Sequence, residues 1–169
     1  MNMRCQRGFT LIELMATIAI AVILATAAVP SFSHFITNQR MNAVARDLQN
    51  ALVLTRSEAI KRNNSVHLIN NVDWAGGMIV STLSTRTYDD CINSANADCV
   101  SVFQPMGDRL SVTPSSAVNT ITYRKNGRLS ISGFTFTICP SPVDSSYQER
   151  IITVGTTGIA QISAGSNCS

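Results

Sequence analysis

The chain has 169 residues, of which 45% are hydrophobic and 14% are charged, and its formal net charge is +3. That length allows one compact domain with a real core and an additional element. A nucleic-acid-binding protein normally carries a clearly basic face, so the small net charge does not favour that class, and only a local basic patch would be compatible with it.

The first predicted element is an apolar segment of 21 residues, from Phe9 to Val29, which contains one charged residue, Glu13. As a helix it would span about 32 Å at about 1.5 Å per residue, which is enough to cross the hydrocarbon core of a bilayer. Arg4 and Arg7 precede it, and the positive-inside rule places them in the cytoplasm. The sequence therefore predicts a single-pass membrane helix with the rest of the chain outside the cytoplasm.

A cleaved secretory signal peptide is the alternative, because Ala25-Thr26-Ala27 forms an A-x-A pattern after the apolar run. Three observations favour the membrane helix. The run is longer than the usual 7–15-residue core of a signal peptide. A buried carboxylate such as Glu13 is costly and usually functional. A helical pattern also continues almost directly from the run.

The residues Arg7-Gly8-Phe9-Thr10-Leu11-Ile12-Glu13-Leu14 resemble the class III leader of type IV pilins and pseudopilins. The resemblance implies that prepilin peptidase removes residues 1–8 by cutting between Gly8 and Phe9, and that the new amino group of Phe9 is methylated. It also implies that Glu13 faces the amino terminus of a neighbouring subunit in a pilus. A desolvated charge is tolerated when an opposite charge meets it, and such pairing would fix the register between apolar helices.

An amphipathic half of the same helix is predicted for residues 30–62. Pro30 lacks an N–H donor and should bend or interrupt the helix. Beyond it, apolar or small residues recur at helical spacing on one face, at Met41, Val44, Ala45, Leu48, Leu52, Thr55 and Ala59. Lys61 and Arg62 suit a helix C-terminus, and Asn63-Asn64 is typical of a helix end. This pattern predicts a helix packed on a globular domain and requires no cofactor.

Residues 63–169 are predicted to form a globular β domain, because short β-rich runs alternate with Gly, Asn, Ser and Pro. The candidate strands are Val66–Ile69, Gly77–Ser81, Val100–Gln104, Arg109–Val112, Asn119–Arg124, Arg128–Ser132, Phe134–Cys139, Arg150–Val154 and Ile159–Ser163. Asn126-Gly127 lies between two of these runs and is a strong signal for a hairpin. The spacing favours an antiparallel sheet or sandwich over βαβ units, so the predicted fold class is α+β, with a long helix packed on antiparallel strands.

Four of the five cysteines lie in the predicted β domain, and Cys5 lies in the predicted leader. An even set of cysteines outside the cytoplasm indicates disulfides, and no C-x-x-C spacing indicates a metal or redox site. Three connectivities are open to four cysteines. Proximity along the chain favours Cys91 with Cys99 and Cys139 with Cys168.

The stretch Thr55-Arg56-Ser57-Glu58-Ala59-Ile60-Lys61-Arg62 resembles the GspH/FimT family of minor pilins and pseudopilins. The resemblance extends more loosely to Trp74-Ala75-Gly76-Gly77, Phe134–Cys139 and Arg150–Val154. It implies a structural subunit that primes pilus assembly at the tip, is held in the bacterial inner membrane with a periplasmic C-terminal domain, and is then incorporated into the pilus. The implied partners are other minor and major pilins, prepilin peptidase, the inner-membrane assembly platform and membrane lipid. A type II secretion pseudopilin of the same fold is the alternative.

No catalytic motif is found in the sequence. His34 and His67, the only two histidines, are more typical of structural or exposed positions than of catalysis. No G-x-S-x-G, P-loop, H-E-x-x-H or EF-hand pattern occurs. We therefore expect no enzymatic activity, no cofactor and no metal.

DNA binding is a further alternative, because some FimT-type minor pilins bind DNA through a basic G-R-x-R motif near the C-terminus. The matching place in this chain reads Gly158-Ile159-Ala160-Gln161, without either arginine. The remaining candidates are Arg124, Lys125 and Arg128, whose charges are also typical of a solvated turn. DNA binding is therefore not favoured.

Overall fold

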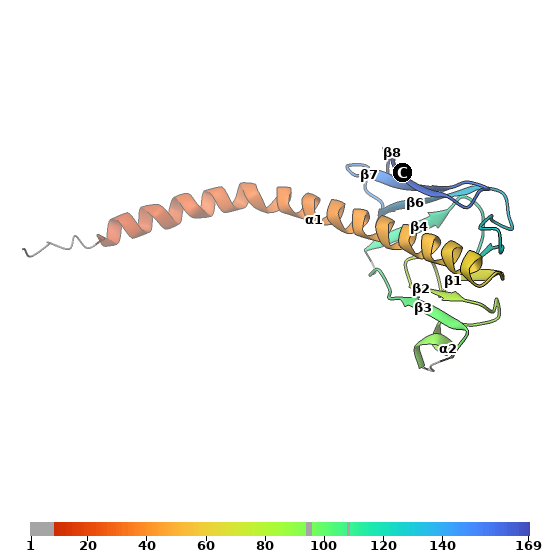
Figure 1. The fold of residues 1–169 in the computed structure, drawn as a ribbon. Helices are drawn as coiled ribbons and strands as arrows, with labels where there is room; N and C mark the ends of the chain where they lie inside the picture. The colour runs from red at the N-terminus through yellow and green to blue at the C-terminus, as the bar shows by residue number, and fades with distance from the viewer. Residues whose placement is uncertain (1–8, 94–95, 108) are drawn as a thin grey trace, which may run out of the picture. The chain divides into compact units, whose positions relative to one another are not determined.

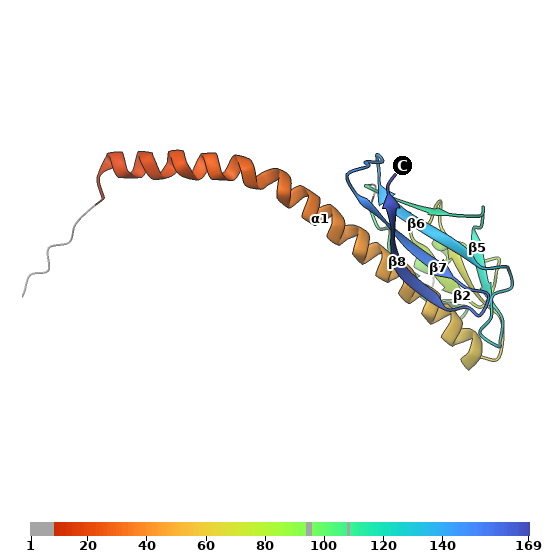
Figure 2. The same ribbon diagram turned by 90° about the horizontal axis from the view of Figure 1, so that it is seen from above.

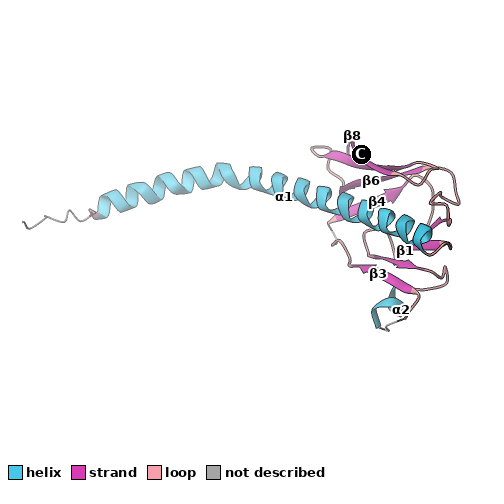
Figure 3. Ribbon diagram, in the orientation of Figure 1, coloured by secondary structure: helices cyan, strands magenta, loops and turns pink. Residues whose placement is uncertain are grey.

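A computed structural model of the chain describes residues 9–93, 96–107 and 109–169, and of residues 27–31 only the backbone. Its elements, in chain order, are α1 (Leu11–Lys61), β1 (Val66–Asn70), β2 (Met78–Ser81), α2 (Tyr88–Asn93), β3 (Cys99–Phe103), β4 (Leu110–Pro114), β5 (Thr120–Tyr123), β6 (Phe134–Pro140), β7 (Gln148–Val154) and β8 (Ala160–Asn167) (Figures 1 and 3). The predicted α+β fold, a long helix with antiparallel strands, is confirmed.

Two compact units make up the chain, and α1 contributes to both. The first unit ends at Thr37, and its helical part presents apolar side chains on every face. Between 55% and 76% of their surface is exposed, at Leu11, Ile12, Leu14, Met15, Ile18, Ile20, Val22, Ile23 and Leu24. The helix runs through Pro30 without interruption, so the expected interruption does not occur. Proline removes one hydrogen bond of the helix, but its fixed φ is itself helical.

The sequence predicts a membrane-spanning helix over residues 9–29. Within the described part of the chain, no helix is both long enough and apolar enough to cross a membrane.

The second unit, Asn38–Ser169, begins with the remaining half of α1, and the buried face predicted for this half is confirmed. All seven predicted residues are at most 4% exposed. Helix α1 ends at Lys61, next to the expected end at Arg62, and Asn63 adopts a left-handed backbone with φ of 50°. The N–H of Asn64 then donates to the carbonyl of Ala59 at 3.2 Å, the bond that closes a helix C-terminus of this type.

Two four-stranded antiparallel sheets complete the second unit, in the orders β3-β2-β1-β5 and β4-β6-β7-β8. Their inner faces and the buried face of α1 share one hydrophobic core, and Figure 2 shows the part of α1 that belongs to this unit lying beside β8. Trp74 and Phe136 join the two sheets edge to face, with ring centroids 4.9 Å apart. The Tyr123 hydroxyl donates to the Gly158 carbonyl at 3.3 Å, and burial raises the pKa of Tyr123 to about 12.

One predicted strand was wrong, and one short helix was not predicted. Arg128–Ser132 is no strand, although Asn126-Gly127 does form a tight turn in which Arg124 N–H donates to Arg128 O at 2.9 Å. Only one bridge follows, between Tyr123 and Leu129, because the chain then crosses towards the second sheet. Helix α2 was not predicted, since six residues are too few to show a helical period.

Helix α2 covers the outer face of the first sheet. Tyr88 packs there with Ile69 and Ile79 in a small second core. Thr87 and Asp90 cap the helix reciprocally: Thr87 N–H donates to Asp90 Oδ2 at 3.0 Å, and Asp90 N–H donates to Thr87 Oγ1 at 3.3 Å. These bonds satisfy donors that a helix start otherwise leaves open.

The burial of His67 should make the stability of the fold towards unfolding depend on pH. Its Nδ1 lies 2.9 Å from Thr122 Oγ1 on the neighbouring strand, and burial lowers its pKa below 6.5. The unfolded chain therefore takes up the proton first as the pH falls. Stability should be full above about pH 6.5 and should decrease below it, towards the folded-state pKa. Denaturant unfolding between pH 5 and 8 should show this slope, and His67→Asn should flatten it; an unchanged slope would assign it to other groups.

Candidate assembly site and interaction surfaces

The start of α1 is closed by Thr10 and Glu13. Glu13 Oε2 accepts hydrogen bonds from the N–H and the hydroxyl of Thr10, each at 2.9 Å. In return, the N–H of Glu13 donates to Thr10 Oγ1 at 3.3 Å. This is a capping box, whose T-x-x-E signature is readable in the sequence. The role of Glu13 in capping the helix was not predicted, because the sequence analysis treated Glu13 as a buried charge that needs a partner.

The second carboxylate oxygen of Glu13 remains available. Both bonds from Thr10 go to Oε2, and within the described residues no hydrogen bond reaches Oε1. Phe9, the residue directly before the cap, is 91% exposed. A carboxylate so placed can accept a cation without giving up its role in the cap. Gly8, on the other side of the predicted cleavage site, lies outside the described residues, as do the other leader residues.

Apolar side chains surround this carboxylate along the helix. Leu11, Ile12, Leu14 and Met15 are each more than half exposed. A helix that is apolar on all sides is normally covered, by a membrane or by other protein. Covering this one removes water from Glu13, which is tolerated only when a partner charge is supplied.

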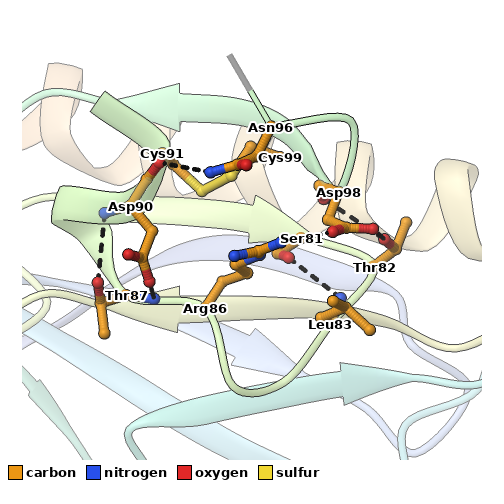
Figure 4. The surroundings of a disulfide bond; sticks show 10 residues. All are labelled: Ser81, Thr82, Leu83, Arg86, Thr87, Asp90, Cys91, Asn96, Asp98 and Cys99. Atoms are coloured by element: carbon orange, nitrogen blue, oxygen red, sulfur yellow. Dashed lines mark hydrogen bonds and ion pairs between the residues drawn. A yellow bond between two sulfur atoms is a disulfide. The ribbon is translucent and has the colours of Figure 1, made fainter. Parts of the chain in front are cut away.

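The cysteines form the two pairs that proximity along the chain favoured. Cys91 and Cys99 are joined with 5.6 Å between their Cα atoms, which ties α2 to the start of β3 (Figure 4). Cys139 and Cys168 are joined with 5.8 Å between their Cα atoms. The second bridge ties β6 to the C-terminal end of the chain, where Cys168 is 1% exposed.

An ion pair braces the loop beside the first bridge. Arg86 Nη2 lies 2.7 Å from Asp98 Oδ2, and Thr82 Oγ1 donates to Asp98 Oδ1 at 3.2 Å (Figure 4). The hydrogen bond from Arg86 is the main cause of a lowered pKa of Asp98, with smaller help from Thr82. The loop is therefore held by charge and covalent bond together.

The predicted basic residues lie on the turn that follows β5. Arg124, Lys125 and Arg128 are exposed, and none of them forms an ion pair with a residue that the structure describes. Arg56 on α1 donates through Nε to Gly127 O at 3.0 Å, so a fourth basic side chain lies beside the turn. DNA binding by this cluster stays a prediction.

Residues 158–161, which stand where the basic G-R-x-R motif would lie, have a structural role. Gly158 turns the chain between β7 and β8 with φ of 80°, and an added Cβ would collide with the carbonyl oxygen of Gly127. Ala160 O, two residues on, accepts a hydrogen bond from Gln49 Nε2 at 3.0 Å. These contacts hold the turn to α1 and to the turn at Gly127.

Comparison with known proteins gives two family matches. The family described as type II transport protein GspH matches residues 44–158, and the prokaryotic N-terminal methylation motif matches residues 3–29. The second match brackets the predicted cleavage site and Glu13.

Solved structures share the fold. The type IV minor pilin FimU of Pseudomonas aeruginosa is 21% identical, with a TM-score of 0.64 over 80% of this chain and 99% of that chain. The minor pseudopilin EpsH from the type 2 secretion system of Vibrio cholerae is 14% identical, with a TM-score of 0.53 over 74% of this chain and 97% of that chain. Both likenesses concern the fold.

Proposed function

Since this chain belongs to the family of the type II transport protein GspH, we propose that it is a minor type IV pilin, a structural subunit of a filament that helps to prime assembly at the tip. The observation that carries this proposal is Glu13: a carboxylate with one open oxygen, at the start of an exposed apolar helix and inside an N-terminal methylation motif. We assign the chain no catalytic role and no cofactor.

In this proposal the chain has four functional segments. Residues 1–8 are a leader that prepilin peptidase removes, residues 9–29 lie in the inner membrane before assembly, residues 30–62 continue the helix, and residues 63–169 form the periplasmic domain. The exposed apolar surface from Leu11 to Leu24 supports a change of cover, from lipid before assembly to the helices of other pilins afterwards. The assembly platform would carry out that transfer.

Electrostatics supports the pairing of Glu13 with the amino terminus of a neighbouring subunit. Cleavage before Phe9 creates an ammonium group at the start of an otherwise apolar helix. In a bundle of such helices, each ammonium and each carboxylate would be costly alone and tolerated together. Because Thr10 fixes the position of the carboxylate, the pair would also set how far one helix stands above the next.

Intact-mass analysis of the protein from native membranes tests the proposal. We expect a chain that begins at Phe9 and carries one additional methyl group. The full-length chain from a strain without prepilin peptidase is the control. A mature chain that begins at Ala28 would show signal-peptide cleavage after the A-x-A pattern and would contradict the proposal.

A type II secretion pseudopilin is the second candidate. It is favoured by the description of the matching family and by the likeness to EpsH. Filaments sheared from the cell surface distinguish the two: the pilus subunit should be present in them, whereas a pseudopilin should stay with the cell envelope.

A further inference from the structure

A groove of about 470 Å³ follows the free edge of β4. Four consecutive residues of the strand, 110–113, line it, together with Asp73 and Gly76 from the loop before β2 and Pro105 from the segment after β3. β4 is an edge strand of its sheet. Consecutive strand residues point to opposite faces, so a groove that touches all four must reach the backbone edge itself.

Two hydrogen bonds to the neighbouring strand show which residues of β4 face that edge. Ser141 N–H donates to Arg109 O, and Ser115 N–H donates to Thr135 O, each at 2.8 Å. Both belong to the single register that pairs β4 with β6. In an antiparallel ladder the residues that bond the neighbouring strand alternate with those that do not. The even-numbered residues within 110–114 therefore direct their backbone groups away from β6, into the groove.

Leu110 and Val112 consequently hold the backbone groups of this edge. Their side chains are buried, with 6% and 7% of the surface exposed. Among the described residues, no hydrogen bond reaches their outward N–H and C=O groups. Pro114, which follows, has no N–H and ends the run of donors. Unpaired backbone groups beside a buried strand need a partner, and an added strand supplies donors and acceptors in the matching order.

Two other edge strands, β8 and β5, are partly covered. On β8, the outward carbonyl of Ala160 accepts from Gln49. On β5, the outward carbonyl of Thr122 accepts from Ser130 N–H at 3.0 Å. The edge of β4 thus combines free backbone groups with a groove that has room for one extended segment.

Charge at one end of the groove indicates what kind of segment fits. A second hollow shares Gly107 and Leu110 with the groove and is also lined by Arg40 and Arg109. Neither arginine forms an ion pair with a described residue. A segment antiparallel to β4 would place its C-terminal end beside Leu110, at these two positive charges.

We propose that the edge of β4 accepts an extended segment of a neighbouring subunit as an added antiparallel strand, with an acidic residue at its C-terminal end facing Arg40 and Arg109. Backbone hydrogen bonds supply the affinity in this mode of recognition, and the arginines select the acidic partner. Only the source of the strand, a neighbouring subunit, rests on the proposed function.

Two synthetic pentapeptides of alternating threonine and valine test the edge, one ending in glutamate and the other in lysine. Each is added to the full chain in detergent while amide hydrogen exchange is measured. The glutamate peptide should slow exchange at Leu110 and Val112 by about tenfold or more, in a saturable way, and the lysine peptide should bind several-fold more weakly. Absence of protection at both amides, or equal affinity of the two peptides, would overturn the proposal.

Matched proline variants separate this edge from strand edges in general. Val112→Pro removes an outward N–H, which an edge strand tolerates, and should abolish the protection at Leu110, the one of the two amides that this variant retains. Ile162→Pro does the same at the edge of β8 and should leave the protection unchanged. Arg109→Glu, on an exposed side chain, sets one negative charge against the positive charge of Arg40 and should remove the preference between the peptides without touching the backbone. No filament is needed, so a failure here is distinguishable from a failure of the proposed function.

Discussion

Glu13→Gln should keep the chain out of filaments, reducing its incorporation by about a hundredfold or more. The change removes the charge that is expected to meet the ammonium of a neighbouring subunit. Removing one partner of a buried pair leaves the other charge without compensation, and effects of that size are typical of such a loss. The amount of the chain in sheared filaments, relative to the amount in the membrane, measures the effect.

The capping box makes glutamine the appropriate substitution. A capping box accepts glutamine as well as glutamate, so Glu13→Gln retains the bond from Thr10 N–H and removes only the charge. Thr10→Val is the matched control, because it removes the cap hydroxyl and retains the carboxylate. Its loss of incorporation should be near fivefold, from a weaker helix start and a less fixed carboxylate. Wild-type incorporation of Glu13→Gln would refute the charge pairing.

The fold was predictable wherever the pattern was local and long. The buried face of α1 repeats over nineteen positions from Met41 to Ala59, and every predicted residue on it is buried. Short elements gave no comparable signal. The run from Arg128 to Ser132 alternates like a strand but is taken across to the other sheet, and α2 is too short to show a period. Both outcomes depend on tertiary contacts.

Of the two candidate sites, one could be identified from local sequence and the other could not. Glu13 was identified because a charge in an apolar run is conspicuous, and its partner Thr10 was readable as T-x-x-E. The groove at β4 was not readable from sequence. It depends on the register that pairs β4 with β6, and on a loop some 35 residues earlier that lines the same hollow. If this register shifted by one residue, the backbone groups of β4 that now point into the groove would instead bond β6, and those that now bond β6 would point into the groove.

Removal of the Cys139–Cys168 bridge should cost more stability than removal of Cys91–Cys99. The two bridges join residues 29 and 8 positions apart. In the chain-entropy model, loops of those lengths correspond to about 3.5 and about 2.5 kcal/mol. The double alanine variants of each pair, unfolded by denaturant as full chains in detergent, measure the difference.

The structure strengthens this order beyond loop length. Cys139 and Cys168 belong to the main core, and Cys168 N–H donates to Tyr147 O at 2.9 Å. Without the bridge, no covalent bond holds the end of β8, an edge strand, and only hydrogen bonds and packing remain, among them those from Gln148 Nε2 to Gly165 O and from Ser166 Oγ to Glu149. Cys91 and Cys99 are only partly buried, and the ion pair of Arg86 with Asp98 still braces their loop when both cysteines are replaced by alanine. Equal losses from the two double variants, or a larger loss from Cys91→Ala/Cys99→Ala, would show that neither loop length nor core position governs the stability of this domain.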